Sequence, residues 1–481
     1  MRTFISENTK WVSLILFSGI YTILNISSVD HFFTWDTIQL ASKHAHWYHD
    51  NEFSELLLPG NMDSGHIPFF GFYLASLWKL FGKSLLVSHL AVLPFMLGII
   101  WQSVLLLKKF IPREFLLPAM AIFLLDPTLL SQSTLVSPDI PLVFFFLMGL
   151  NCLLNNKRDL YMVAILGLFL VSMRGMMTAF GLLLVDLFKN AEWTGFRHTV
   201  KQLVRMSLSY LPAVFIFLLY NVYHYHEKGW VIYHQDSPWA SSFDKVSIMG
   251  VLFNLGLLGW RFIDLGRVFV WLPALVLLFR HRKMIRKDNE PGLLLFIFIA
   301  VTLSLTINII WYQNLTAHRY FIPVYLSFAL MACYLLFHLR HEKIKKVLAT
   351  IWILGLVTGN LWVYPEKIAQ GWDSTLAHLP YYELKNKMLA YMEENNIPMS
   401  KTGSSFPDLA PMKYMYLNND NRSFCQLDLS ENQYVYYSNF HNYFSDSQID
   451  ILKEKWILLR EYSKGGVFVS LYKNPGKKCH P

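Results

Sequence analysis

Two aspartates, Asp36 and Asp139, lie beside apolar stretches, in "HFFTWDTIQL" and "LVSPDIPLVFFF". An acid at the start of a helix is most often a cap or a first-turn residue that suits the helix dipole. If the two carboxylates converge in space, however, one can act as the general base for an alcohol or amine nucleophile while the other orients it. The chemistry that this pair would serve is transfer of a group to such a nucleophile.

A second set of residues offers positive charge and hydrogen-bond donors. His66 lies in "DSGHIP", Arg174 in "VSMRGMM", and His318, Arg319 and Tyr320 lie together in "NLTAHRYFIP". Each cation taken alone is explained by snorkelling to lipid headgroups. Together they predict a phosphate site, because arginine forks match phosphate oxygens and stabilise the charge of a departing phosphate.

A third group of titratable residues lies in "NVYHYHEKGWVIYHQD", which contains His224, His226, Glu227 and His234. Their spacing is not diagnostic of a metal site, and solvated or aromatic-packed histidines are the commoner explanation. We therefore assign no metal ligands and no certain cofactor, and a divalent metal stays an open alternative. His224 and His226 are placed with His318 and Tyr320 among residues of a candidate substrate loop.

The composition indicates what kind of scaffold must position these residues. The chain has 481 residues, of which 54% are hydrophobic and only 16% are charged, against about one quarter charged in soluble domains. This predicts an integral membrane protein with many spans. The net charge of +9 does not indicate nucleic-acid binding, because the basic residues lie at the ends of apolar segments and form no single stripe.

Helical spans need roughly 20 mostly apolar residues, and the chain offers about eleven candidates. They are approximately 11–28, 84–107, 115–132, 139–154, 160–173, 175–190, 206–222, 266–280, 291–310, 319–338 and 347–363. The first is expected to be an uncleaved span, because no small-residue cleavage site follows it. Basic clusters such as "RHRKMIRK" (280–287) and "RHEKIKK" (340–346) alternate along the chain in the way the positive-inside rule requires of a cytoplasmic N-terminus.

That orientation places every candidate site residue on the outer side of the membrane. The first outer loop, 29–83, is expected to carry two interfacial helices, 35–49 and 68–81, because apolar and polar residues alternate there at helical spacing. Asp36 stands at the head of the first of these helices.

The pattern changes after residue 363 to that of a small α/β domain, 364–481. We expect helices over "LPYYELKNKMLAYMEENN" and "SQIDILKEKW", a strand over "QYVYYSNF", and a hairpin that turns at 464–466. The fold class is thus an all-α polytopic domain, 1–363, with a soluble extracytoplasmic α/β domain. Among the four cysteines, Cys425 and Cys479 lie in this tail, where a disulfide or two free thiols are both compatible with the sequence.

Four segments together resemble the GT-C superfamily of integral-membrane glycosyltransferases, in the branch of protein O-mannosyltransferases and lipid A aminoarabinose transferases. They are "TWDTIQLASKHAHWY", "DSGHIPFFGFYLASLWKLFGKSLLVSHLAVLPFMLG", "LLSQSTLVSPDIPLVFFFLMGL" and "HRYFIPVYLSFALM". The resemblance extends over most of residues 1–340, and the order and spacing of the segments carry it more than any single motif.

This resemblance implies a sugar donor linked to polyprenyl phosphate and transfer on the outer face of a membrane, with the bacterial inner membrane as the expected location. It matches Asp36 to the catalytic aspartate, Asp139 to the acid of the second outer loop, and Arg319 and Arg174 to cations near the donor phosphate. The sequence departs from the family pattern at Thr37, which replaces a frequent second acid. It also departs around His66, where a lysine-containing entry is usual, so His66 could replace that lysine only as a hydrogen-bond donor or when protonated.

The implied chemistry is consistent with the residue types. A lipid phosphate is already a good leaving group, so one base suffices and the paired acid and base of a glycosidase are not needed. Asp36 would take the proton of a lipid, glycan or protein acceptor, and the configuration of the sugar would invert. The alternatives are a secondary transporter, which should carry ionisable groups at mid-membrane depth, and a non-catalytic membrane scaffold. Acyl transfer is a further alternative, although no combination of histidine and acid requires it.

Overall fold

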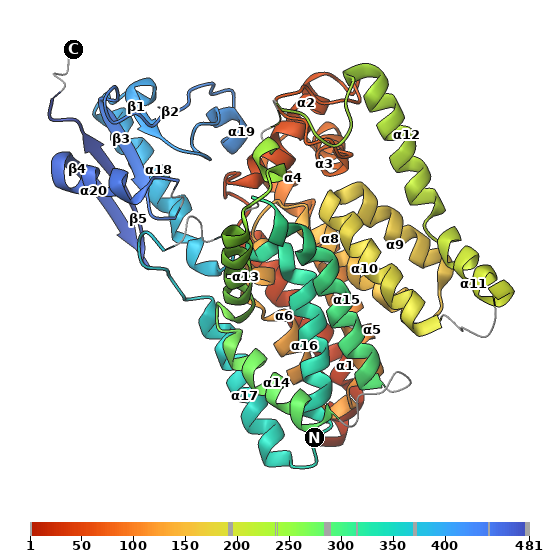
Figure 1. Ribbon diagram of the computed structural model, residues 1–481. Coiled ribbons are helices and arrows are strands. Elements are labelled where there is room, and N and C mark those ends of the chain that lie inside the picture. The colour runs from red at the N-terminus through yellow and green to blue at the C-terminus, as the bar shows by residue number, and fades with distance from the viewer. Residues whose placement is uncertain are drawn as a thin grey trace.

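The computed structural model describes residues 2–190, 196–235, 237, 239–282, 290–313, 316–368, 373–440 and 443–476. Figure 1 shows a body of helices with the C-terminal sheet domain at one end and to one side of it. The body contains α1 (Arg2–Ser27), α2 (Lys43–Asp50), α3 (Phe69–Phe81), α4 (Leu85–Leu90), α5 (Leu93–Phe110), α6 (Leu116–Leu124), α7 (Pro127–Gln132), α8 (Asp139–Leu154), α9 (Arg158–Val171), α10 (Met173–Asn190), α11 (Phe196–Leu208), α12 (Leu211–Lys228), α13 (Ile248–Ile263), α14 (Val268–Arg280), α15 (Glu290–Trp311), α16 (Ile322–Phe337) and α17 (Glu342–Gly359). Short helical turns are η1 (Ile38–Ser42), η2 (Arg113–Phe115), η3 (Ala240–Phe243) and η5 (His318–Phe321).

Each of the eleven expected spans coincides with one or more of these helices. Within the described ranges, four segments are long and apolar enough to cross a membrane, namely Thr9–Ser27, Leu85–Phe110, Glu290–Trp311 and His318–Phe337. The number rises to six if the bent pairs α11–α12 and α13–α14, with angles of 61° and 98°, each count as one span. This is fewer than eleven, because several of the other apolar helices are shorter than 18 residues and α10 carries three charged residues.

The helix α16 forms the centre of the body. Every one of its residues is buried, and it packs against α15, α14 and α6. A helix that is apolar on all sides is stable only inside other structure or lipid. Because η5 leads directly into α16, the side chains of η5 are held by the most enclosed element of the protein.

The break between α13 and α14 depends on close backbone packing against α17. Gly266 has a φ of +76°, and a Cβ atom there would lie 1.9 Å from the carbonyl oxygen of Gly355 in α17. Both the left-handed conformation and the contact exclude a larger side chain. Substitution of Gly266 must therefore distort the junction of three helices.

We predict that Gly266→Ala lowers stability by about 2–4 kcal/mol, the sum of backbone strain and overpacking. Thermal unfolding of the purified protein in detergent measures the effect. The matched control is Gly256→Ala in α13, where a Cβ atom would meet nothing within 4 Å, so that this change should leave stability equal or slightly higher. Equal losses in both variants would contradict the proposed close packing.

The segment 29–83, the expected first outer loop, contains two helices at the places where the sequence predicts them. The first is formed by η1 and α2, and the second is α3, which begins directly after Pro68. These helices pack closely on each other, and a Cβ atom at Gly71 in α3 would lie 2.3 Å from the Cβ of His44 in α2. The loop is therefore a compact unit and can hold Asp36 in a fixed place.

The C-terminal domain has a mixed five-stranded sheet with strand order β2-β1-β3-β5-β4. Its elements are η6 (Leu376–His378), α18 (Pro380–Glu394), η7 (Met399–Lys401), β1 (Thr402–Ser404), α19 (Met412–Tyr416), β2 (Cys425–Gln426), β3 (Tyr434–Ser438), α20 (Asp446–Lys455), β4 (Ile457–Lys464) and β5 (Val467–Lys473). The predicted helices, strand and hairpin are confirmed, and Gly465 and Gly466 both have positive φ, as a two-residue hairpin turn requires. The expected fold class is thereby confirmed, while β1, β2 and α19 are additions that the sequence pattern did not indicate.

Hydrogen bonds join this domain to the segment between α1 and α3 of the helical body. The amide of Phe33 donates to the carbonyl of Met415 at 2.9 Å, and the Ser42 hydroxyl donates to the carbonyl of Tyr414 at 2.6 Å. The rings of His31 and Tyr382 stack with centroids 4.0 Å apart. Cys425 is a free thiol, and Cys479, its potential disulfide partner, lies outside the described residues.

Candidate active site

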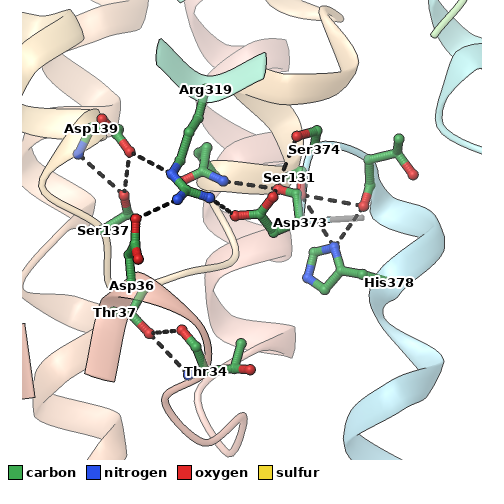
Figure 2. Close-up of polar contacts among 12 residues, drawn as sticks. Thr34, Asp36, Thr37, Ser131, Ser137, Asp139, Arg319, Asp373, Ser374 and His378 are labelled. Carbon is green, nitrogen blue, oxygen red and sulfur yellow. Dashed lines mark hydrogen bonds and ion pairs between the residues drawn. The ribbon is translucent and has the colours of Figure 1, made fainter. Parts of the chain in front are cut away.

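Arg319 is the centre of a cluster of three carboxylates from three distant parts of the chain (Figure 2). Its Nη2 donates to Asp36 Oδ2 at 2.5 Å, and its Nε lies 3.5 Å from Asp139 Oδ2. Its Nη1 donates to Asp373 Oδ2. The guanidinium group thus contacts a different acid with each of its three nitrogens.

A second arginine completes the cluster. Arg174 Nη1 donates to Asp139 Oδ1 at 2.5 Å, so that Asp139 lies between two guanidinium groups. The Arg174 guanidinium also stacks over the Tyr320 ring, 4.1 Å from its centroid. Three carboxylates against two guanidinium groups leave a formal excess of one negative charge.

Local structure explains how each side chain reaches the cluster. Asp36 follows Trp35, whose φ of +54° turns the chain sharply at the entry to the first interfacial helix. The Thr37 hydroxyl closes this turn by donating to the Thr34 carbonyl at 2.5 Å. Asp139 begins α8, where the Ser137 hydroxyl donates to its carboxylate at 3.2 Å.

Asp373 comes from the segment that enters the C-terminal domain, and α7 fixes its backbone. The Ser131 hydroxyl and the Gln132 side-chain amide donate to the Asp373 carbonyl at 2.7 and 2.9 Å. Ser131 also lies 3.2 Å from His378 Nδ1 (Figure 2). The third carboxylate is therefore anchored to α7 of the helical body.

The cluster borders a narrow cleft with a cavity volume of only about 10 Å³, room for roughly one water molecule. The cleft is lined by the charged residues and by side chains from the segments that precede α2 and α8, namely Thr34, Trp35, Asp36, Thr37, Leu40, Gln132, Leu135, Ser137, Pro138, Asp139, Arg174, Arg319 and Asp373. The side chains of Asp139, Asp373 and Arg319 are 5%, 9% and 3% exposed, whereas that of Asp36 is 23% exposed. Among the three acids, Asp36 is therefore the one that an incoming group can reach most easily.

The C-terminal domain covers one side of this cleft with aromatic rings. Trp35 stacks on Tyr443, with centroids 5.2 Å apart, and also packs against Phe406. Burial, reinforced by the nearby Asp36 charge, raises the pKa of Tyr443 to about 12. The hydroxyl of Tyr443 is consequently neutral at physiological pH and can donate a hydrogen bond.

Burial and the charges of Asp36 and Asp139 determine the protonation of Asp373. Loss of solvent raises the pKa of the Asp373 carboxyl, the two neighbouring carboxylates raise it further, and Arg319 opposes the change. The net direction is upward. Asp373 therefore takes up a proton more readily than an exposed aspartate does.

His66 lies in the first outer loop and does not line the cleft. Its Nδ1 is 2.8 Å from the Ser64 hydroxyl. Loss of solvent around the ring, with a smaller effect of the Arg174 charge, lowers the pKa of His66. A role for His66 toward a phosphate would accordingly be that of a neutral donor.

His318 stands directly before Arg319 but points to a different partner. Its Nε2 lies 3.1 Å from Asp264 Oδ2, and Tyr364 donates to the same oxygen. Next to this group, Arg267 forms a buried ion pair with Asp126 through Nε at 2.7 Å. These contacts anchor η5 and leave the neighbouring Tyr320 beside the arginines.

The histidines His224 and His226 were expected on a loop, and the structure corrects this. They lie in the last turns of α12, because the helix extends to Lys228. His224 is buried with its Nε2 2.9 Å from Asp63 Oδ2, whereas His226 is exposed beside Glu227. The same expected loop also contains the helix α13, and neither histidine lines the cleft beside Arg319.

The described part of the chain contains no group of three or more His, Cys, Asp or Glu side chains placed to hold a metal ion.

The acid that sequence reasoning missed is Asp373. It follows the last apolar run on the expected outer side, in "QGWDSTLAHL", and so occupies the same kind of position as Asp36 and Asp139. An acid directly after an apolar run is a signal that the sequence contains. Asp373, however, lies in a tail whose pattern is that of a separate domain.

Comparison with solved structures finds the same architecture. ArnT from Cupriavidus metallidurans bound to undecaprenyl phosphate superposes with a TM-score of 0.52 at 13% sequence identity, over 96% of this chain and 98% of that chain. The apo state of the same protein gives a TM-score of 0.50 at 12% identity, over 97% and 98%. This chain has the ArnT fold.

The likeness includes the C-terminal domain, since it covers nearly the whole of both chains. The expected resemblance is confirmed at the level of the fold by these two ArnT structures. No family model matches the sequence. No curated protein matches it either.

Proposed function

We propose that this protein is a membrane glycosyltransferase that moves a sugar from a polyprenyl-phosphate carrier to an acceptor on the outer face of the membrane. The observation that carries the proposal is the cluster of Asp36, Asp139, Arg174 and Arg319 around one cleft, in a fold shared with ArnT bound to undecaprenyl phosphate. Acids and arginines beside one small space suit a reaction that needs a base and a phosphate site together.

Asp36 is the proposed general base. It is the most exposed of the three acids, and its Oδ2 accepts a hydrogen bond from Arg319, which leaves Oδ1 available for an acceptor hydroxyl or amine. The acceptor attacks the anomeric carbon as Asp36 removes its proton, and the carbon–oxygen bond to the lipid phosphate breaks. Attack from the face opposite the phosphate inverts the configuration.

Arg174 and Arg319 are the proposed phosphate-binding groups. Both guanidinium groups border the cleft, and they are joined through Asp139, so that a phosphate placed there would meet two positive charges. The arginines stabilise the polyprenyl phosphate as its negative charge grows. Through its ion pairs with both arginines, Asp139 fixes the position of one guanidinium group relative to the other.

The test is incubation of the purified protein with radiolabelled polyprenyl-phosphate sugars and a membrane extract, with Asp36→Asn as the inactive control. The proposal requires at least one donor whose label moves to an acceptor fraction only when Asp36 is present. Absence of such transfer across a panel of neutral, acidic and amino sugars would remove the support for a transferase.

We predict that Arg174→Gln raises the donor KM by about tenfold, because one charge-assisted contact to the phosphate is lost. The value of kcat should fall less, since Arg319 remains in place. Steady-state kinetics with varied donor measure both quantities. The control is Arg113→Gln, an exposed arginine of η2 outside the cleft, and the prediction fails if the two variants have the same KM.

A further inference from the structure

A phosphate that approaches Arg319 meets three carboxylates already in contact with its guanidinium group. Each of its three nitrogens already faces an acid, in the arrangement drawn in Figure 2. Although the guanidinium has further N–H donors, a phosphate would be a fourth anionic group around this cation, so its binding is favoured when one carboxyl group leaves Arg319 or takes up a proton. Which of the three carboxyl groups leaves Arg319 determines how donor binding is coupled to the ion pairs of the empty site.

The three acids differ in what else holds them. Asp139 has a second ion pair with Arg174 and a hydrogen bond from Ser137. Asp36 is the proposed base and must stay ionised beside the acceptor. The Asp373 carboxylate, in contrast, has Arg319 as the single cation among its described ion-pair partners, and Ser374 is 3.4 Å away.

Asp373 is also the acid that belongs to the C-terminal segment. Its backbone stays fixed through the bonds from Ser131 and Gln132 to its carbonyl, whatever its side chain does. The carboxyl group can therefore leave the guanidinium without disturbing the chain. Release of Asp373, with a proton taken up, therefore leaves both the Asp139–Arg174 ion pair and the proposed base in place.

We propose that Asp373 is a positioning residue that holds Arg319 in the empty site and releases it to the donor phosphate as the Asp373 carboxyl takes a proton from solvent. This inference rests on the proposed function and deepens it, because it assigns the C-terminal segment a part in donor binding.

The environment of Asp373 supports uptake of a proton. Burial and the carboxylates of Asp36 and Asp139 raise the pKa of its carboxyl, as described above, and a bound phosphate adds another negative charge. Burial lowers the pKa of the nearby His378 to about 4, so its ring is neutral at neutral pH and contributes no charge. Among the described residues, the other titratable or charged groups around Asp373 are Arg319, Tyr382, Tyr443 and, beyond Asp139, Arg174, with Tyr320 beside the two arginines.

The experiment measures binding of farnesyl-phosphoryl-glucose, a phosphodiester whose own charge is constant over the pH range used, to the full-length protein in detergent. The wild type should bind more tightly as the pH falls through the raised pKa of Asp373. Asp373→Asn should bind about tenfold more tightly at neutral pH, a typical size for such coupling, and should lose the pH dependence. Its kcat and KM should both fall, because polyprenyl phosphate, the product, then leaves more slowly.

Two further variants separate this role from a purely structural one. Asp373→Glu keeps the charge and should keep the pH dependence. Glu454→Gln neutralises an exposed acid in α20 of the same domain and should behave as the wild type. Because the pH dependence is a property of the wild type, the inference stays testable even if Asp373→Asn folds poorly.

The outcomes are distinguishable. Weaker binding together with slower turnover in Asp373→Asn would mean that Asp373 only supports the site, and a flat binding profile in the wild type would overturn the inference directly. Either result leaves the proposed function intact if transfer still depends on Asp36. A folded wild type that neither binds the phosphodiester nor transfers sugar would overturn both.

Discussion

Asp36→Asn is expected to reduce sugar transfer by about 10²–10⁴-fold, the usual contribution of a positioned general base. The amide has nearly the shape of the carboxylate, and its oxygen can still accept the hydrogen bond from Arg319 that Asp36 accepts at 2.5 Å. What it cannot do is take the acceptor's proton. The loss should therefore appear in kcat, while the protein folds normally and binds donor at least as well.

The measurement is transfer of radiolabel at saturating donor, together with donor binding and thermal unfolding of the same preparation. Asp50→Asn is the matched control, because Asp50 ends α2 in the same outer loop and its side chain is 55% exposed. Transfer by Asp36→Asn above about a tenth of the wild-type rate would show that Asp36 is not the base.

Arg319→Gln is expected to cost both stability and activity. The change leaves the buried carboxylates of Asp139 and Asp373 facing Asp36 without their shared cation. Removing one partner of a buried ion pair typically costs about 3–5 kcal/mol. Transfer should fall by at least about 10²-fold, because the remaining Arg174 cannot replace a group that faces the phosphate directly.

Arg319→Lys separates the two effects. Lysine keeps the positive charge but has one ammonium group in place of a planar fork, so it cannot contact three acids at once. Stability should recover in large part, while transfer stays well below the wild type. Thermal unfolding and kcat report the two quantities, and Arg422→Lys, at a side chain 58% exposed, controls for the substitution itself. Full activity in Arg319→Lys would contradict a bidentate phosphate contact.

Much of the fold could be predicted because the bilayer restricts what an apolar chain can do. Long apolar runs such as 291–310 and 319–338 must be helices, and basic residues between them alternate along the chain. The same restriction explains why four of the site residues could be named. Asp36, Asp139, Arg174 and Arg319 all stand at expected outer ends of spans, which lie at one level and can converge.

The rest depended on contacts that no local pattern encodes. Packing between distant segments determines three of these features. They are the left-handed turn at Trp35, the hydrogen bond between His318 and Asp264, and the hydrogen bond between His224 and Asp63. Asp373 follows an apolar run as Asp36 and Asp139 do, but it was missed because the tail around it has the pattern of a separate domain. Nothing in the sequence around it shows that its carbonyl will be bound by Ser131 and Gln132.

The position of Asp373 also has a consequence for biosynthesis. Ribosomes make the N-terminal helices first, so α1 to α16 can enter the membrane while the segment after α17 is still being translated. Until that segment docks on α7, the Arg319 guanidinium lacks one of its three acids. Completion of the candidate site is thus among the last events in making the protein, and a nascent or prematurely terminated chain would carry the proposed base without the finished cleft.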